Sequence, residues 1–330
     1  MFGSGLISTI IKMEYESIVE RALSRLPEGF KLSVIWWNTG MRALQKELEG
    51  IEPSHTAQIN KVKRKLLERQ GVVRRLIRES DILILGEYIN EFGLTGDVAR
   101  INFEASKSKC NSCYSCVDLY YEASGKMIFD NYVVYNKNKL YCVPQSIIER
   151  TVSNVGTRRK ERRYKAYQCV KFDCVRFTNK SLDVFVVHWN MRDGFGGNEK
   201  RAAKLKAAEL LAKKIEPAGG RPFKIVAGDF NNEPYEESLM WLESSRSRDY
   251  VSTAGGLYNP FWKYLNEEAR TIYSPKNHEF MANGAIFDGI LVNRSFVERA
   301  DQWRITPSIL EARFVMDVHD HNPVKLVLEH

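Results

Sequence analysis

The sequence has no apolar run long enough to cross a bilayer, so it does not predict a membrane-spanning helix. The opening segment 1–13 is apolar in places, but it lacks the basic start and the small-residue cleavage site of a signal peptide. We therefore expect a cytoplasmic protein with no membrane partner. Internal repeats, low-complexity tracts and Pro/Gly/Ser-rich linkers are also absent, so the composition does not divide the chain.

Cysteine is scarce, with six residues in 330. Without a secretion signal these residues are expected to be reduced thiols rather than a disulfide framework. Cys110, Cys113 and Cys116 form a C-x2-C-x2-C run, which raises the question of zinc. A structural zinc site needs four ligands, usually in two separated pairs, and a fourth would have to come from another cysteine or a distant histidine. We favour half-buried thiols in a loop and do not expect a structural zinc site.

The remaining composition is that of an ordinary globular protein. Apolar residues make up 44% of the chain and charged residues 27%, which is ample material for a core. A length of 330 residues allows one large domain or two modest ones. The net charge of +8 favours an anionic partner.

Hydrophobic patterning predicts a chain that alternates between strands and helices. Residues 14–26 read as a short helix before Pro27, so we expect an N-terminal helical extension over residues 1–30 and a single domain over 31–330. Compact apolar or β-branched runs predict strands at 32–37, 81–85, 132–135, 167–172, 184–187, 223–227, 286–292 and 323–328. Apolar positions at helical spacing predict helices at 56–79, 198–215 and about 235–245.

These elements predict an α+β fold. The stretch from about 99 to 188 is mostly strand-like, and strands occur near both ends of the domain as well as in its middle. Two mixed sheets packed face to face, with helices on the outside, accommodate so many short strands. The expected architecture is a four-layer α/β/β/α sandwich.

Polar side chains recur at the ends of the predicted strands. Any one of them has an ordinary explanation as a solvated loop residue, a turn, a helix cap or a structural histidine. The repetition is harder to explain, because six of the apolar strands each carry or adjoin an acid, an amide or an imidazole, as metal and phosphate chemistry requires. The residues concerned are Asn38, Glu87, His188, Asn190, Asp229, Asn231, Asp288, Asp320 and His321.

Taken in this order, these segments resemble the endonuclease/exonuclease/phosphatase superfamily, which has the deoxyribonuclease-I-like fold. The resemblance covers residues 32–328, and its most specific pieces are Gly228-Asp229-Phe230-Asn231, Asp320-His321 and Trp37-Asn38. A further segment, Gly256–Trp262, is similar to one in poorly characterised bacterial members. Relatives usually have Gln where Gly86 stands and often Ser where His319 stands, which weakens assignment to a named subfamily.

The resemblance implies a role for each of these residues. Glu87 would be the main magnesium ligand, with Asn38 beside it and Asp320 at a second metal position, and the same ligands would accept manganese. Asp229 and Asn231 would position or deprotonate the attacking water and hold the phosphate. His321, held by Asp288, would bind or protonate a phosphate oxygen, His188 would help to stabilise the leaving side, and Asn190 would bind the substrate. How the acid and base roles divide between Asp229, His188 and His321 stays open.

The densest basic cluster spans residues 158–165 in a predicted loop. Arg158, Arg159, Arg162 and Arg163 could grip a nucleic-acid backbone, with Tyr164 or Tyr167 stacking on a base or sugar. The alternative is a solvated basic loop on the far side of the domain.

Three functions follow from these observations. The favoured one is a Mg-dependent phosphodiester hydrolase, a nuclease acting on DNA or else RNA. The second is a phosphatase or phospholipase for small-molecule or lipid phosphoesters, although a Trp-Cys-Asp-Arg-like segment and a membrane-binding apolar loop are lacking. The third is a catalytically dead binding module, which the intact set of polar residues argues against.

Overall fold

The computed structural model describes residues 29–89, 93–107, 113–123, 127–143, 147–154, 162–175, 181–189, 197–215, 223–241, 247–266, 270–272, 285–298, 303–310 and 321–330. Within these ranges no helix is both long and apolar enough to span a membrane. The predicted helix 14–26 and the extension 1–30 fall almost wholly outside them.

Six strands form the first sheet, and the first and last strands of the described chain lie side by side in it. Residues 31–36 of β1 pair antiparallel with residues 324–329 of β15, whereas β1 and β2 are parallel. The remaining neighbours are antiparallel. In spatial order the strands are β14 (Arg304–Ile309), β15 (Val324–Glu329), β1 (Lys31–Asn38), β2 (Ile82–Gly86), β6 (Tyr132–Asn136) and β3 (Tyr114–Asp118).

The second sheet contains seven strands and repeats this pattern. Its one parallel pair, β10 with β11, lies near the middle, and β8 is added to β9 off the main path. The path runs through β12 (Leu257–Tyr258), β13 (Asp288–Asn293), β11 (Phe223–Asp229), β10 (Ser181–His188), β9 (Arg162–Cys174) and β7 (Leu140–Cys142), with β8 at Ile148–Asn154. The predicted strands at 167–172 and 184–187 lie side by side, because β9 and β10 are antiparallel neighbours.

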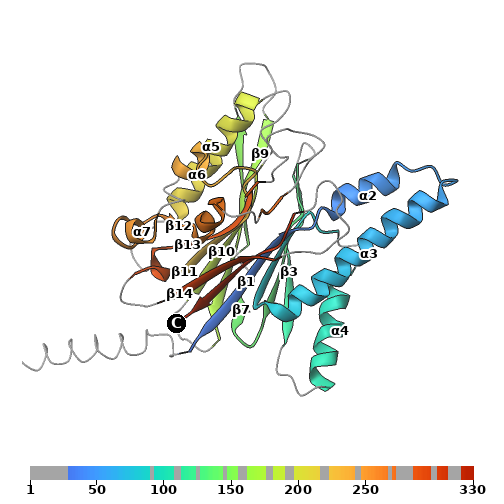
Figure 1. Ribbon diagram of the computed structural model, residues 1–330, viewed down its shortest axis with the longest axis horizontal. Helices are drawn as coiled ribbons and strands as arrows, with labels where there is room; N and C mark the ends of the chain where they lie inside the picture. Colours follow the sequence, from blue (N-terminus) through green and yellow to red (C-terminus); the bar gives the residue numbers. More distant parts are fainter. Residues whose placement is uncertain are drawn as a thin grey trace, which may run out of the picture.

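The two sheets pack face to face and helices cover both outer faces (Figure 1). The interior includes Trp36, Ile84, Val184, Ile225 and Leu326, all buried in one apolar cluster. A second cluster joins the first sheet to its helices and a third joins the second sheet to its helices. The first set is α2 (Met41–Glu49), α3 (Thr56–Glu79) and α4 (Leu94–Lys107), and the second is α5 (Gly197–Ile215) and α6 (Glu237–Trp241). The expected four-layer sandwich is therefore confirmed.

Most predicted elements lie where the apolar spacing placed them. The predicted helix 56–79 has the bounds of α3, and Val62, Leu66, Val73 and Leu76 are buried along its inner face. The strand-like reading from residue 99 onward is wrong for α4, because Leu94, Val98 and Ile101 bury one helical face at spacings of four and three residues.

The cysteines lie mostly at intermediate depth. Cys113 and Cys116 are half-buried free thiols, and burial raises the pKa of Cys116 to about 12. Cys110 lies outside the described residues.

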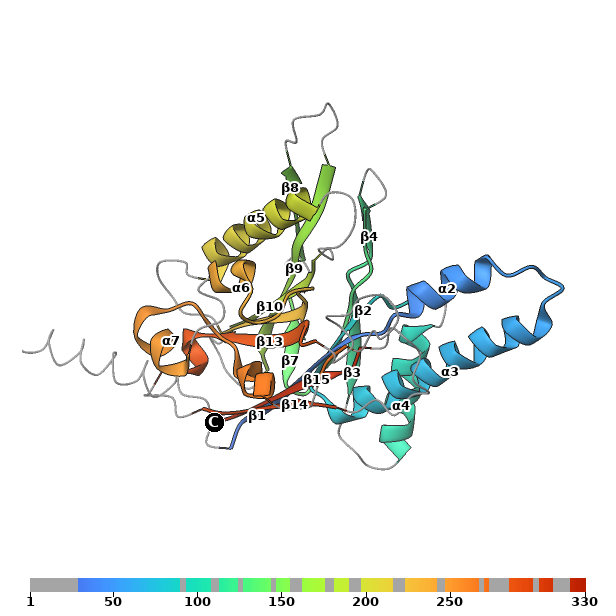
Figure 2. The ribbon, with the colours of Figure 1, turned by 45° about the horizontal axis from the view of Figure 1, so that its top comes forward.

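Two β-hairpins extend past the edge of the sandwich at which β2 and β10 end (Figure 2). In the second sheet Gln168 pairs with Val186, so residues 162–165 of β9, together with their β8 partners, lie beyond His188. In the first sheet Leu85 pairs with Tyr132, which places the small β4–β5 sheet (Tyr121–Ala123 and Met127–Phe129) beyond the end of β2. The edge between the two hairpins carries the polar residues described next.

Candidate active site

Strand register brings the predicted site residues to one edge of the sandwich. Asn38 ends β1 and lies opposite Gly86, the last residue of the parallel strand β2. His188 and Asp229 end the parallel pair β10 and β11, and Asp229 lies opposite Asp288 at the start of β13. Because each parallel pair ends at this edge, residues far apart in the sequence meet there.

Asn38 links the two sheets at this edge. Its amide Nδ2 donates to Asp229 Oδ2 over 3.2 Å and lies 3.5 Å from Glu87 Oε1. Asn38 and Asp229 are both buried. The amide therefore fixes the separation between a carboxylate of the first sheet and a carboxylate of the second.

Glu87 adopts a left-handed backbone conformation, with a φ of 51°, which costs free energy for a residue that has a Cβ. The hydroxyl of Thr39 lies 2.9 Å from the carbonyl oxygens of both Gly86 and Glu87. Arg69 in turn donates to the Thr39 carbonyl over 2.6 Å from its buried place on α3. These contacts hold the Glu87 carboxylate at the mouth of the site despite the unfavourable backbone.

Asp288 orients His321. Its Oδ2 lies 2.7 Å from His321 Nδ1, and its Oδ1 accepts a hydrogen bond from Trp36 Nε1 over 2.7 Å. Trp37 Nε1 donates to the His321 carbonyl over 2.8 Å. Because both oxygens of Asp288 are occupied, the imidazole is fixed with Nε2 directed to Asp229, 3.9 Å from its Oδ2.

The same arrangement sets the protonation of His321. Burial favours the neutral imidazole, but the carboxylates of Asp288, Asp229 and Glu87 outweigh it and raise the pKa of His321 to about 9. Burial and the neighbouring Asp288 raise the pKa of Asp229, and the two histidines oppose that shift. At neutral pH His321 is therefore an imidazolium, which can bind an anionic oxygen or donate a proton to it.

His188 completes the ring of side chains from the β10 side. Its Nε2 lies 3.6 Å from Glu87 Oε1 and 3.9 Å from Asp229 Oδ2. Its Nδ1 is buried and has no hydrogen-bond partner among the described residues. Nε2 is thus the nitrogen that faces the centre of the site.

The donor set fits a hard divalent cation. Glu87 Oε1 and Asp229 Oδ2 converge on the same two groups, the Asn38 amide and His188 Nε2, and a cation bound between them would offset the repulsion between the two carboxylates. The ligand atoms of Asp229, Asp288 and His321 also lie within 4.8 Å of one another. Asp288 is engaged by Trp36 and His321, so Glu87, Asp229 and Asn38 are the side chains that could hold such a cation.

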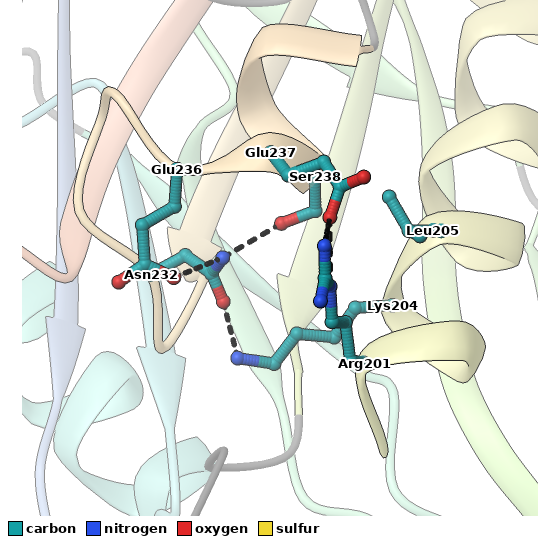
Figure 3. Close-up of a pocket in the computed structure, with 7 residues that line it drawn as sticks. All are labelled: Arg201, Lys204, Leu205, Asn232, Glu236, Glu237 and Ser238. Carbon is teal, nitrogen blue, oxygen red and sulfur yellow. Dashed lines mark hydrogen bonds and ion pairs between the residues drawn. The ribbon is translucent and has the colours of Figure 1, made fainter. Parts of the chain in front are cut away.

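The turn after β11 is held from behind by a buried lysine. Asn231 has a φ of 49°, its backbone N–H donates to Asp229 Oδ1 over 2.8 Å, and its side chain donates to the Trp189 carbonyl over 2.6 Å. Lys204 of α5 is 5% exposed, and its ammonium donates to the Asn231 carbonyl over 2.7 Å. It also contacts Asn232 Oδ1, as Figure 3 shows.

Asn232 connects the same turn to α6. Its amide nitrogen lies 2.7 Å from Glu236 Oε2 and 2.8 Å from Ser238 Oγ (Figure 3). The turn that carries Asp229 and Asn231 is therefore clamped between two helices.

Comparisons with known proteins identify the fold. No family model and no curated protein matches this sequence. The structure is similar to that of TDP2 from C. elegans, with a TM-score of 0.53 and 14% identity over 100% of this chain and 82% of that one. The chain has the endonuclease/exonuclease/phosphatase fold.

Two further structures share the fold. The structure of D. rerio TDP2 complexed with a single-strand DNA product matches with a TM-score of 0.51 and 15% identity, over 91% of this chain and 99% of that one. An endonuclease/exonuclease/phosphatase family protein from *Bacteroides thetaiotaomicron* matches with a TM-score of 0.50 and 14% identity, over 92% and 99% of the two chains.

Six predicted site residues therefore meet at one edge of this fold: Asn38, Glu87, His188, Asp229, Asp288 and His321. Asn231 lies in the adjoining turn. Asp320, Asn190, Arg158 and Arg159 lie outside the described residues. Arg162 and Arg163 begin β9, in the hairpin that passes the active-site edge, and their side chains are likewise not described.

The predicted stacking role of Tyr164 or Tyr167 is wrong. Tyr164 is 8% exposed and Tyr167 is 3% exposed, and both rings belong to the apolar cluster beneath α5. A buried ring cannot offer a face to a base. The β-rich pattern around these tyrosines was the signal for a buried strand.

Sequence reasoning missed Lys204. In the predicted helix at 198–215 the apolar Leu205 is only half-buried, whereas Lys204, four residues before the buried Ala208, is itself buried. A lysine that lies at helical spacing from buried residues points into the protein and needs an internal partner. This spacing was the overlooked signal.

A small cationic group at the active-site edge was also missed. Asp130 is buried between Arg42 Nε at 3.6 Å and Lys165 Nζ at 3.4 Å. Arg42 lies 6.0 Å from the ring of Tyr120, which is 44% exposed. One carboxylate thus serves two cations, which leaves a net positive charge beside the site.

Proposed function

We propose that this chain is a metal-dependent phosphodiester hydrolase that acts on nucleic acid, with DNA favoured over RNA. The observation that carries the proposal is the convergence of two carboxylates, an amide and two histidines from both sheets, with His321 locked by Asp288. Such a set supplies oxygen ligands for a hard cation together with an imidazolium for an anionic oxygen.

Each side chain has a defined task in this proposal. Glu87, Asp229 and Asn38 would hold Mg²⁺, or Mn²⁺ in its place, which polarises the phosphoryl oxygen and offsets developing charge. Asp229 and Asn231 position the attacking water. His321 binds or protonates a phosphate oxygen, because Asp288 keeps it charged at neutral pH. His188 faces the same centre from the opposite side, next to Glu87.

Charge and shape at the active-site edge support a nucleic-acid substrate. The β4–β5 and β8–β9 hairpins flank the site, and Arg162 and Arg163 of the basic cluster begin β9 in the second of them. Arg42 and Lys165 lie near the site and share the carboxylate of Asp130. Tyr120 and Tyr121 are 44% and 45% exposed on the β4 side, and exposed rings can stack on bases.

The decisive test is cleavage by purified protein. Supercoiled plasmid, linear duplex, single-stranded DNA and RNA would be incubated with the protein in Mg²⁺ and in EDTA. We expect Mg²⁺-dependent cleavage that is lost in Asp229→Asn and His321→Ala. Asp183→Asn is a matched control, because Asp183 is also a buried acid of the second sheet but lies near the start of β10. Turnover of only small phosphoesters would refute the nucleic-acid assignment while leaving the hydrolase assignment intact.

Arg42→Gln tests the basic rim separately. If Arg42 neutralises one phosphate, its loss should reduce the slope of log affinity against log salt by about 0.9 on duplex DNA. Arg64→Gln is the control, because Arg64 also pairs with one carboxylate, Glu68 at 3.7 Å, but lies on the outer helix α3. Equal slopes for the wild type and Arg42→Gln would exclude this rim from substrate binding.

A further inference from the structure

A second cleft lies at the edge of the sandwich where the two sheets are bridged by a short helix. It has a volume of about 620 Å³ and lies beside β12, the 3-10 helix η3 (Pro260–Asn266) and β14. Its lining includes Arg248, Tyr258, Trp262, Lys263, Ile305 and Pro307. Half of them come from the segment Gly256–Trp262 and its neighbour Lys263, which the proposed chemistry leaves without a role.

The walls of the cleft are fixed by local structure. Gly255 and Gly256 have φ values of 94° and 88°, a conformation that lets the chain turn sharply between α7 (Arg248–Ala254) and β12. Asn259 Oδ1 then accepts from the Phe261 N–H over 3.0 Å and opens η3. The Tyr264 hydroxyl donates to the Pro307 carbonyl over 2.9 Å, which ties η3 to β14.

The cleft carries two positive charges and no acidic group among its described lining residues. Arg248 donates an N–H to the Trp303 carbonyl over 2.8 Å, which holds its guanidinium in place. The Lys263 ammonium lies 4.6 Å from the centre of the Tyr264 ring. Within the part of the chain that the structure describes, neither cation has a carboxylate partner, so both charges can bind an anion.

Aromatic surface adjoins these charges. Tyr258 and Trp262 are half-buried in the lining, and Pro260, Ile305 and Pro307 add apolar surface. Burial raises the pKa of Tyr258, and both Arg248 and Lys263 oppose that shift. The phenol is therefore a neutral hydrogen-bond donor within electrostatic reach of both cations.

We propose that this cleft is a second binding site, separate from the active site, for a nucleoside phosphate. The phosphate would lie between Arg248 and Lys263, and the planar base would rest on Trp262 and Tyr258. Tyr258 pairs with Val292, four residues along β13 from Asp288, which is roughly 13 Å of strand. Occupancy of the cleft therefore uses no residue of the proposed catalytic set, and the inference does not depend on the proposed function.

The test is calorimetric titration of the full chain in EDTA, so that no ligand is cleaved. The probes are adenosine 5′-monophosphate, adenosine, inorganic phosphate and a 5′-phosphorylated single-stranded octanucleotide. We expect the monophosphate to bind at least tenfold more tightly than adenosine or inorganic phosphate, because only it engages both the rings and the charges. If the monophosphate and the octanucleotide bind with equal affinity, the result points to a free nucleotide as the ligand. If the octanucleotide binds more tightly and its affinity depends on salt, the result points to a nucleic-acid strand.

Variants decide whether binding occurs in this cleft. Arg248→Gln/Lys263→Gln should weaken the monophosphate at least tenfold, and Trp262→Ala should weaken it while leaving inorganic phosphate unchanged. Lys61→Gln/Lys63→Gln removes two charges from the exposed face of α3 and should change nothing. Unchanged affinity in both cleft variants, or no binding of any probe to the wild type, would overturn the proposal. Trp262→Ala keeps the test valid if loss of the Arg248 contact impairs folding.

Discussion

Replacement of Lys204 by Met separates the positioning of the active-site turn from its chemistry. The ammonium of Lys204 is buried and serves the Asn231 carbonyl and Asn232 Oδ1. Met fills a similar volume but leaves two buried acceptors without a donor, at about 1–3 kcal/mol each. The variant no longer buries a charged ammonium, and this offsets part of the loss. We therefore expect the free energy of unfolding to fall by about 2–4 kcal/mol in total.

The effect on turnover should be larger than stability alone explains. When the clamp is removed, Asn231 no longer has its left-handed conformation fixed, and Asp229 loses the backbone contact that Asn231 provides. A displacement of about 1 Å in a catalytic group costs on the order of 100-fold in rate. We therefore expect kcat to fall about 10- to 100-fold with little change in KM, and Lys204→Gln, which keeps a donor, to retain more activity.

Lys224→Met is the matched control for this experiment. Lys224 is another buried lysine, 2% exposed, and its ammonium serves the carbonyls of Lys214 and Ile215 at the far end of β11. It should be destabilised to a similar degree in urea unfolding but keep its kcat at a temperature where both variants are folded. The reasoning would be refuted if Lys204→Met kept the wild-type kcat or if Lys224→Met lost as much.

Three further predictions address pH, packing and metal. The pKa of His321 rises from 6.5 to about 9 on folding, so its contribution, on the order of 3 kcal/mol, should be present below pH 6.5 and lost as the pH rises through 9. In EDTA, the difference in unfolding free energy between wild type and Asp288→Asn should therefore shrink between pH 6 and pH 10, and a constant difference would contradict the assignment. A Cβ on Gly228 would lie 2.0 Å from a backbone oxygen of β10, whereas one on Gly289 would have no neighbour nearer than 3.6 Å. Gly228→Ala should thus cost more than about 3 kcal/mol and Gly289→Ala under about 1 kcal/mol in urea unfolding, and similar values would refute the packing argument. Saturating Mg²⁺ should raise the Tm of the wild type and raise that of Glu87→Gln far less, so equal shifts would remove Glu87 from the metal site.

The layered fold and the centre of the site could be predicted from the sequence because both leave short-range signals. Apolar runs such as 32–37 and 223–227 are buried strands, and the polar residue after each run marks the sheet edge. The order of these pieces along the chain then carried the resemblance. Helix α4 escaped prediction because the strand-rich region that follows it extended the strand reading to about residue 99.

Long-range contacts between side chains left no such signal. Nothing in the sequence pairs Trp36 with Asp288, since the hydrogen bond joins residues 252 positions apart. Asp130 between Arg42 and Lys165 is equally invisible, because each member comes from a different element. The cleft at Gly256–Trp262 could be suspected from an unusual motif, but its cations came together only through the folding of η3 against β14.

The crossing of the chain between the two sheets makes each sheet a joint product of both halves of the molecule. Strands β1, β2, β3 and β6 are completed by β14 and β15, and strands β7 to β10 are completed by β11, β12 and β13. The site divides in the same way, with Asn38, Glu87 and His188 before α5 and Asp229, Asp288 and His321 after it. Neither half contains all of these side chains, so two fragments made by dividing the chain before α5 would each be inactive alone. Their restored activity on mixing would report reassembly of the sandwich, which makes this chain suited to fragment complementation.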